Sequence, residues 1–290
     1  MLPPPMKPAP FHYHAPKTIE EAIATLASVA SDDGRVLAGG QSLVPTMAFR
    51  LARPKHLVDI NGVAEFARLA VKGERLCIGA TVRHAAFERS VAKGPLGELL
   101  SEVVQHIAHK PIRARGTFCG SIAHADPASE WCLVAAALDA EMVARRVRGE
   151  RVIAAKDFFD SIMTTALEDN ELLTEVRLPL LSVETRFGFY EFNRRAGDFA
   201  IAMVLVTYRL KDSKIVEPRV ALGGVEAFPR RIADAEALLD GRTPNANVFT
   251  AAADAAAKAA DPLDDESTSA DYRRGLVRTV VLRALQRAAR

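Results

Sequence analysis

The first stretch of the chain that could do chemistry is residues 36–43, which read VLAGGQSL. A short apolar strand is expected to end at Gly39 and Gly40, and two small polar residues follow. Glycines allow unusual backbone dihedrals and a close approach to a ligand, so successive N–H groups can point into one concavity. Such a concavity binds phosphate without a cationic side chain. A tight strand-to-loop turn is the alternative interpretation of this segment.

A second candidate lies at residues 116–127, which read GTFCGSIAHADP. It offers hydroxyls at Thr117 and Ser121, and Asp126 and Pro127 then predict a helix start as N-cap and first helical residue. The positive end of a helix dipole favours an anion. Neither segment matches GxGxxG or GxxxxGK[ST], so neither a Rossmann nor a P-loop site is predicted. Two phosphate-binding candidates in one chain are a stronger signal than either alone.

Metal chemistry is not expected on this chain. The three cysteines, Cys77, Cys119 and Cys132, form no CxxC pair, which excludes a zinc ribbon and a self-contained iron–sulfur cluster. The seven histidines form no HExxH motif, and no carboxylate completes a site beside His106 and His109. The cysteines are therefore expected to be reduced, partly buried thiols.

The elements that must position the two candidate segments belong to a chain of 290 residues, which predicts two or three domains. The net charge of +2 is too weak for a dedicated nucleic-acid binder. No apolar run approaches the roughly 18 residues that span a bilayer, and the proline-rich start lacks the apolar region of a signal peptide. We therefore expect a cytoplasmic protein with no nucleic-acid or membrane partner.

The pattern of elements changes near residue 180. Before it, short strands alternate with helices, residues 110–125 fit neither period and predict a long loop, and a helix is expected from Asp126 to about Leu138. After it, three strand-like stretches precede three helices, which implies an antiparallel sheet covered on one face. The strand-like stretches are residues 186–192, 201–210 and 215–223. A lesser boundary is expected near residue 60.

Four motifs extend these observations to nearly the whole chain from about residue 7. They are AGGQSLVP at 38–45, IGATVRH at 78–84, GTFCGSIAHADPASE at 116–130 and YEFNRRAGDFAIA at 190–202. In this order and spacing they resemble the FAD-binding medium subunit of the molybdenum hydroxylases, a family that includes xanthine dehydrogenase and carbon monoxide dehydrogenase.

The resemblance implies an α+β fold of two domains. The first is a two-lobed FAD-binding domain of the vanillyl-alcohol-oxidase (PCMH) type at residues 1–178, with lobes at about 7–60 and 61–178. The second is a C-terminal antiparallel sheet with helices at residues 179–290, of the carbon monoxide dehydrogenase flavoprotein type.

The resemblance also implies how FAD is held. Residues 37–43 would bind the pyrophosphate, and Thr117, Gly120 and Ser121 would form the second dinucleotide loop. Cys119 stands where the family usually has the first glycine of TxGGS, so this position is either unstrained or remodelled. His124 is either a hydrogen-bond donor to the flavin or a packing residue. Asp126 and Glu130 are expected on the ribose or adenine side, and Tyr190 at the isoalloxazine. The expected cofactor contacts are Leu37, Ala38, Gly39, Gly40, Gln41, Ser42, Leu43, Ala80, Thr81, Thr117, Cys119, Gly120, Ser121, His124, Asp126, Glu130, Leu172 or Leu173, and Tyr190.

The function implied by the resemblance is electron transfer without a catalytic residue on this chain. A large molybdopterin-binding subunit would hydroxylate the substrate, and a small subunit would relay electrons through two [2Fe–2S] clusters to FAD on this chain, which would pass them to an external acceptor. The subunits are expected as a dimer of heterotrimers, docked around Tyr190 and the 117–124 loop. A self-sufficient FAD-dependent oxidoreductase of the same fold and a non-redox nucleotide-binding module are the alternatives.

Overall fold

The N-terminal lobe is built on a three-stranded parallel sheet in the computed structural model, which describes residues 7–266 and 268–290. The strands, in the order β1-β3-β2, are β1 (His12–His14), β3 (His56–Asp59) and β2 (Gly34–Leu37). Helix α1 (Ile19–Val29) begins at Thr18, whose hydroxyl accepts a hydrogen bond from the Glu21 amide. Its buried face packs on the sheet through Ala22 and Leu26. After β2, the chain turns into the short helix α2 (Leu43–Ala48).

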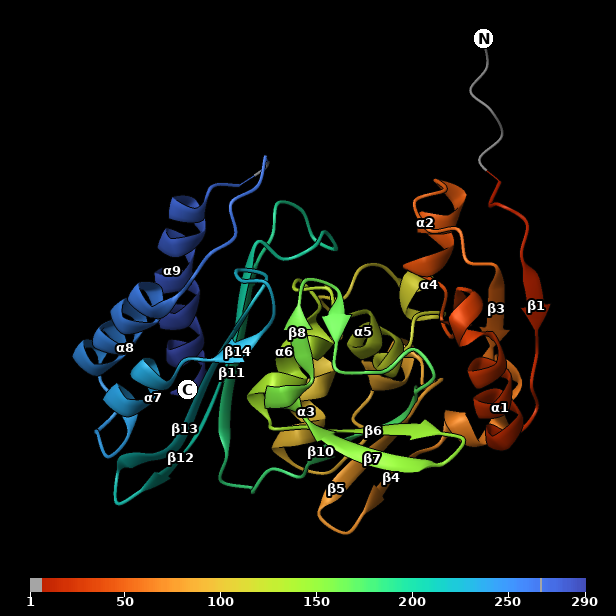
Figure 1. Ribbon diagram of the computed structural model, residues 1–290. Helices are drawn as coiled ribbons and strands as arrows, with labels where there is room; N and C mark the ends of the chain where they lie inside the picture. Colours follow the sequence, from red (N-terminus) through yellow and green to blue (C-terminus); the bar gives the residue numbers. More distant parts are fainter. Residues whose placement is uncertain (1–6, 267) are drawn as a thin grey trace.

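The second lobe is a five-stranded antiparallel sheet with helices on one face (Figure 1). Its strands, in spatial order, are β4 (Leu69–Lys72), β5 (Arg75–Gly79), β10 (Leu172–Pro179), β6 (Glu141–Arg146) and β7 (Gly149–Ala154). The helices are α3 (Pro95–Val103), α4 (Lys110–Arg113), α5 (Phe118–His124) and α6 (Glu130–Ala137). A small hairpin of β8 (Phe159–Ser161) and β9 (Thr164–Thr165) precedes β10. Trp131 of α6 is fully buried in the core of this lobe.

Two expectations for this lobe are wrong. Residues 110–125 are not one long loop, because they contain α4 and α5. Helix α6 begins at Glu130 rather than at Asp126, whose carboxylate instead accepts a hydrogen bond from the Ala128 amide and forms a turn. Both errors have the same cause: helices of four to eight residues, buried on all sides in the case of α6, give no periodic apolar stripe to detect.

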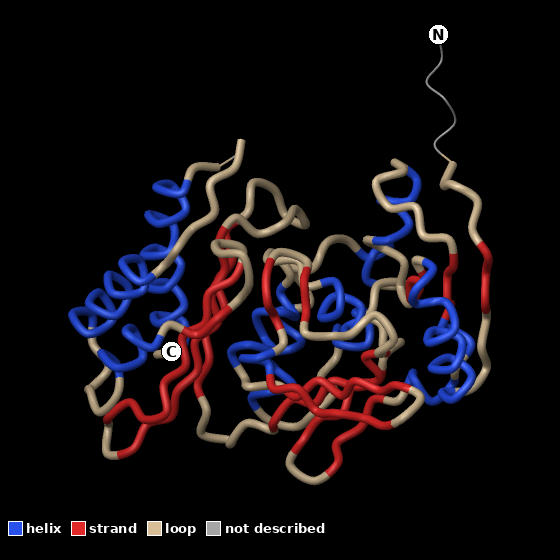
Figure 2. Tube along the Cα trace, in the orientation of Figure 1, coloured by secondary structure: helices blue, strands red, loops and turns tan. Residues whose placement is uncertain are grey.

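The C-terminal domain is an antiparallel sheet with both faces covered. Figure 2 shows its helices on the outer face and the second lobe on the other. Alternate residues of β12 divide between the two sides, since Val204 and Val206 join the core under the helices while Met203 and Leu205 join the core of the second lobe. The expectation of a single covered face was therefore incomplete. The elements are β11 (Arg186–Phe192), β12 (Ala202–Lys211), β13 (Lys214–Gly223), β14 (Arg230–Arg231), α7 (Ala233–Leu239), α8 (Ala246–Ala259) and α9 (Ala270–Ala288).

The expected α+β class, with an antiparallel C-terminal sheet and helices, is confirmed. The chain leaves the sheet of the second lobe at Pro179 and enters the C-terminal sheet at Arg186. No helix in the described ranges has the length and apolar character needed to cross a membrane.

Candidate cofactor site

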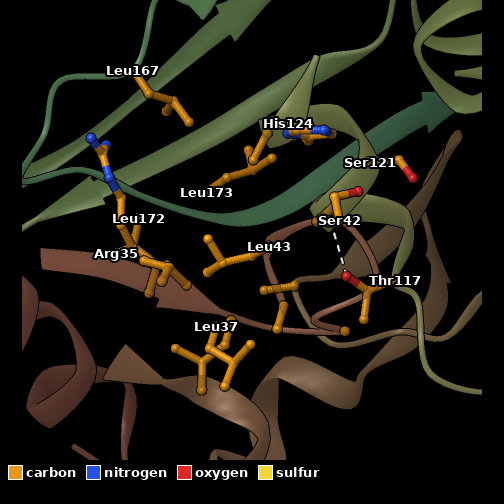
Figure 3. A pocket seen from close by; sticks show the side chains of 18 of the residues that line it. Arg35, Leu37, Ser42, Leu43, Thr117, Ser121, His124, Leu167, Leu172 and Leu173 are labelled. Carbon is orange, nitrogen blue, oxygen red and sulfur yellow. Dashed lines mark hydrogen bonds between the residues drawn. The ribbon is translucent and has the colours of Figure 1, made fainter. Parts of the chain in front are cut away.

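A cavity of about 530 Å³ lies between the N-terminal lobe and the second lobe. One wall is the segment from β2 to the start of α2, and the opposite wall is α5 with the β8–β9 hairpin. Figure 3 shows leucine side chains, among them Leu37, Leu43 and Leu172, gathered in one part of the cavity, and the hydroxyls of Thr117 and Ser121 in another. The cavity therefore combines an apolar part, suited to a planar ring, with a polar part.

Most of the residues expected to contact the cofactor line this cavity. They are Leu37, Ala38, Gly39, Gly40, Gln41, Ser42, Leu43, Ala80, Thr117, Cys119, Gly120, Ser121, His124, Leu172 and Leu173. The fold thus brings together segments that are about 40 and 80 residues apart in the sequence. Neither loop supplies a lysine or arginine to the cavity, which agrees with binding through backbone amides and hydroxyls.

The two glycine-containing loops touch at Gly39. A Cβ atom placed on this residue would lie 2.5 Å from the Arg115 carbonyl oxygen and 2.6 Å from the Gly116 Cα. Both neighbours are backbone atoms, so only glycine allows the loops to approach this closely. Gly40 adopts a φ of +72°, a left-handed conformation that also favours glycine. The two loops are therefore in direct backbone contact, and we call the wall that they form together beside the cavity the cradle.

Two residues that are not among the expected cofactor contacts, Asn61 and Arg83, fix the spacing of the loops. The Arg83 guanidinium donates hydrogen bonds to the Arg115 carbonyl and, at 2.6 Å, to the Asn61 side-chain oxygen. The Asn61 side-chain amide in turn donates to the Ala38 carbonyl at 2.7 Å. This chain of hydrogen bonds ties the base of the 38–43 loop to the segment before α5. The sequence does not mark this network, although Arg83 lies within the IGATVRH motif.

Helix α5 is positioned by its own N-cap. The Thr117 hydroxyl accepts a hydrogen bond from the Gly120 amide at 3.0 Å. A Cβ atom on Gly120 would lie only 2.5 Å from that hydroxyl, so the glycine makes room for the cap. In contrast, the Ser42 side chain makes no capping bond to α2. The Ser42 hydroxyl is therefore available to a ligand in the cavity.

Cys119 occupies an unstrained position. It lies in the first turn of α5 with helical backbone, so the glycine that the family usually has here is not required by the dihedral angles. The thiol points away from solvent and donates weak hydrogen bonds to the carbonyls of Ile78 and Gly79, at 3.4 and 3.5 Å. Burial raises the pKa of Cys119 far above its ordinary value, so the thiol stays protonated. Of the two alternatives for this position, the structure shows the unstrained one.

A Cys119→Gly variant is expected to bind FAD within about twofold of the wild type, but to unfold more easily by about 1–2 kcal/mol. Glycine inside a helix lowers the free energy of unfolding by about 1 kcal/mol, and removal of the buried thiol leaves a small void. Urea unfolding and an FAD titration measure the two effects. Loss of FAD binding in a folded variant would show that the thiol contacts the cofactor directly.

Tyr190 does not line the cavity. Its ring lies under the guanidinium groups of Arg283 and Arg287, at 5.0 and 4.8 Å from the ring centroid, and its hydroxyl accepts a hydrogen bond from Arg283. Because side chains alternate along β11, it is Phe189 and Glu191 that face the second lobe. The residue expected at the isoalloxazine therefore packs against α9 instead.

Thr81, Asp126 and Glu130 are also outside the cavity lining. Glu130 is buried at the start of α6, where burial and the nearby Glu191 carboxyl raise its pKa to about 8. Burial likewise raises the pKa of Glu191 to about 7. One Glu191 oxygen has no hydrogen-bond partner and lies 3.7 Å from His106 Nδ1. The two carboxyls form an acid pair between the second lobe and the C-terminal domain.

Several cavity residues were missed by sequence analysis. The β8–β9 hairpin and the loop after it contribute Met163, Thr164, Thr165, Leu167, Glu168, Asp169 and Glu171. Glu171 is held by a two-pronged ion pair with Arg151, with both contacts at 2.7 Å, and this bond holds its pKa below the ordinary value. Arg35 lines the same end. No motif marks this segment, so only the fold reveals it.

Comparisons with known proteins agree with this geometry. Residues 9–181 match the family model described as "FAD binding domain in molybdopterin dehydrogenase", and residues 187–288 match that of the "CO dehydrogenase flavoprotein C-terminal domain". The chain is 38% identical to the nicotine 6-hydroxylase medium subunit of Paenarthrobacter nicotinovorans, over 98% of this chain and 99% of that one. It is 35% identical to the carbon monoxide dehydrogenase medium chain of Hydrogenophaga pseudoflava, over 98% of each.

Solved structures give the same result. The chain superimposes on carbon monoxide dehydrogenase from Hydrogenophaga pseudoflava with a TM-score of 0.93 and 35% identity, over 97% of this chain and 98% of that one. Quinoline 2-oxidoreductase from Pseudomonas putida 86 gives a TM-score of 0.92 and 34% identity over 98% of each. The chain therefore belongs to the family of FAD-binding medium subunits of the molybdenum hydroxylases, as the four motifs indicate, and it is an oxidoreductase component with FAD as its cofactor.

Proposed function

We propose that this chain is the electron-transfer subunit of a multi-subunit molybdenum hydroxylase, receiving electrons from a [2Fe–2S] subunit and passing them to an external acceptor. The observation that carries the proposal is the match of both domains, and not of the FAD-binding domain alone, to proteins named as medium subunits. FAD supplies the redox chemistry when bound, while the residues of this chain bind it, orient it and shield it from water.

The cavity supports an assignment of roles to its residues. The 38–43 loop and residues 117–121 would hold the pyrophosphate between them, and Leu37, Leu43 and Leu172 would pack against the rings. His84 would support this arrangement as a neutral group, because burial lowers its pKa to about 4 and its Nδ1 accepts a hydrogen bond from the Trp131 indole at 2.9 Å. No residue is assigned a catalytic proton transfer.

The partners in this proposal are a large molybdopterin-binding subunit and a small [2Fe–2S] subunit, assembled as a dimer of heterotrimers in the cytoplasm. The three cysteines of this chain are each buried in its own core, with the pKa of Cys132 raised by burial to about 12, so they are not cluster ligands. The clusters are therefore assigned to the small subunit.

The purified chain, loaded with FAD, is expected to oxidise no heterocycle, aldehyde or carbon monoxide. Dithionite should nevertheless bleach the flavin absorbance, and an artificial acceptor should restore it, because these steps need only the cofactor. Stopped-flow spectra recorded with the two partner subunits added should show bleaching that depends on substrate. Turnover of an organic substrate by the chain alone would replace this proposal with a self-sufficient flavoenzyme.

A further inference from the structure

Helix α2 and the turn after it expose three apolar side chains to solvent. Val44 is 50% exposed, Phe49 63% and Leu51 81%. We call these three residues, with the flanking Arg50 and Arg53, the α2 patch. Scattered exposed apolar residues are ordinary, but three within eight positions on one short element are typical of a binding surface.

The backbone fixes the patch in this exposed form. Arg50 adopts a left-handed φ of +58°, a backbone conformation that is unfavourable for any residue other than glycine. The turn is closed by hydrogen bonds from the Arg50 amide to the Met47 carbonyl and from the Leu51 amide to the Thr46 carbonyl, each 2.9 Å long. Met47, in contrast, is buried and anchors the helix. Phe49 and Leu51 are therefore held outward rather than folded onto the core.

The charge around the α2 patch selects the kind of partner. Between Asp33 and Asp59 the sequence has no acidic residue, and it has four basic ones. Arg35 pairs with Asp33 and Lys55 with Asp32, whereas Arg50 and Arg53 have no carboxylate partner within the described ranges and donate to backbone carbonyls. A second copy of this chain would bring the same cations face to face. A partner protein with an apolar surface and an acidic rim is complementary to the α2 patch.

The position of the α2 patch relates it to electron transfer. Ser42 and Leu43 line the cofactor cavity, and Val44 is the next residue of the same helix. Any protein seated on Val44 therefore lies within about one helical turn of the cavity wall. Because electron transfer slows steeply with the distance between cofactors, this is a favourable place for an electron donor to dock.

We propose, resting on the function proposed above, that the α2 patch is the docking surface for the [2Fe–2S] subunit, which meets it with an apolar surface rimmed by carboxylates. This differs from the sequence-based expectation of docking around Tyr190 and the 117–124 loop. Tyr190 is covered by Arg283 and Arg287. Within the loop, Phe118, Cys119 and Ile122 are buried in the core of the second lobe.

The first test introduces a negative charge at the most exposed apolar residue of the α2 patch. Leu51→Asp, in the full FAD-loaded chain, is expected to weaken binding of the purified [2Fe–2S] subunit at least tenfold in a titration. FAD content should be unchanged, because Leu51 does not line the cavity. Val183→Asp is the matched control, since Val183 is an equally exposed apolar residue (85%) in the link between the domains. It should bind within twofold of the wild type.

The second test identifies the occupant. The natural cysteines are buried, so a Leu51→Cys variant can be labelled selectively with a photo-crosslinker and assembled with both partner subunits. A crosslink to the [2Fe–2S] subunit supports the proposal. A crosslink to the molybdenum subunit, to a second copy or to residues 1–6 of this chain overturns it.

The outcomes of the titration separate the two proposals. A wild-type chain that holds FAD but binds no [2Fe–2S] subunit would overturn the proposed function and the docking surface together. Two other outcomes, in which the wild type does bind this subunit, would overturn the docking surface alone. In one, Leu51→Asp binds the [2Fe–2S] subunit as tightly as the wild type does. In the other, Val183→Asp weakens this binding as much as Leu51→Asp does.

Discussion

A Gly39→Ala variant is expected to lose FAD binding by at least about 100-fold, which corresponds to about 2.7 kcal/mol. The added Cβ would lie 2.5 Å from the Arg115 carbonyl oxygen, and neither backbone can yield without separating the two loops. The hydrogen bonds of Asn61 and Arg83 hold the two loops together at their bases, so the added Cβ would displace the cradle itself. A cofactor held by both loops would then be held by only one.

FAD titration followed by fluorescence measures this loss, and circular dichroism shows whether the variant is folded. Gly275→Ala is the matched control, because a Cβ at this position of α9 meets no atom within 4 Å. It should bind FAD normally and be more stable by about 0.5–1 kcal/mol, since alanine is a better helix former than glycine. Normal FAD affinity in Gly39→Ala would mean that the 38–43 loop is an ordinary turn.

A Glu191→Gln variant is expected to be more stable than the wild type at pH 8, by about 2–3 kcal/mol, and nearly equal to it at pH 5. The Glu191 side chain is fully buried next to the Glu130 carboxyl, and its pKa rises from the usual 4.5 to about 7. The folded chain therefore holds protons that the unfolded chain releases. A neutral amide of the same shape removes the cost of burying the charge.

The direction of the pH dependence follows from proton linkage. Because the folded-state pKa values of the acid pair are raised, the contribution of this pair to wild-type stability should fall as the pH rises from about 4.5 to about 8. His84 acts in the opposite direction between its folded-state pKa of about 4 and its usual 6.5, but it is common to both proteins and its contribution cancels in the difference. Urea unfolding of the FAD-free proteins at several pH values measures the effect.

Glu74→Gln serves as the control for the acid pair. Glu74 is exposed in the turn between β4 and β5, so its substitution should change stability by less than about 0.5 kcal/mol at every pH. Parallel pH profiles of Glu191→Gln and the wild type would show that the acid pair does not titrate in this range.

The sequence by itself determined the features that depend on neighbouring residues. The glycines at 39 and 40 and the hydroxyls at 117 and 121 predicted two anion-binding turns, and both turns line one cavity. Whether these segments bind an anion stays a prediction, but their place at one cavity follows a pattern that a few consecutive residues set, since glycine alone has the dihedral freedom and the close approach found at 39 and 40. Three strand-like stretches after residue 180 were likewise predicted, and they pair as an antiparallel sheet.

Only the tertiary structure decided which side chains meet across long distances. Alternation along β11 places Tyr190 and Glu191 on opposite faces, but the sequence does not say which face meets the second lobe. In the structure Tyr190 packs under Arg283 and Arg287 of α9, whereas Glu191 faces His106. The same holds for the contact of Gly39 with Arg115, for the β8–β9 hairpin at the cavity and for the exposure of Leu51. A local sequence pattern determines the periodicity of a helix or strand. The elements that it packs against depend on how the whole chain buries its apolar surface, because that burial supplies most of the favourable free energy of folding.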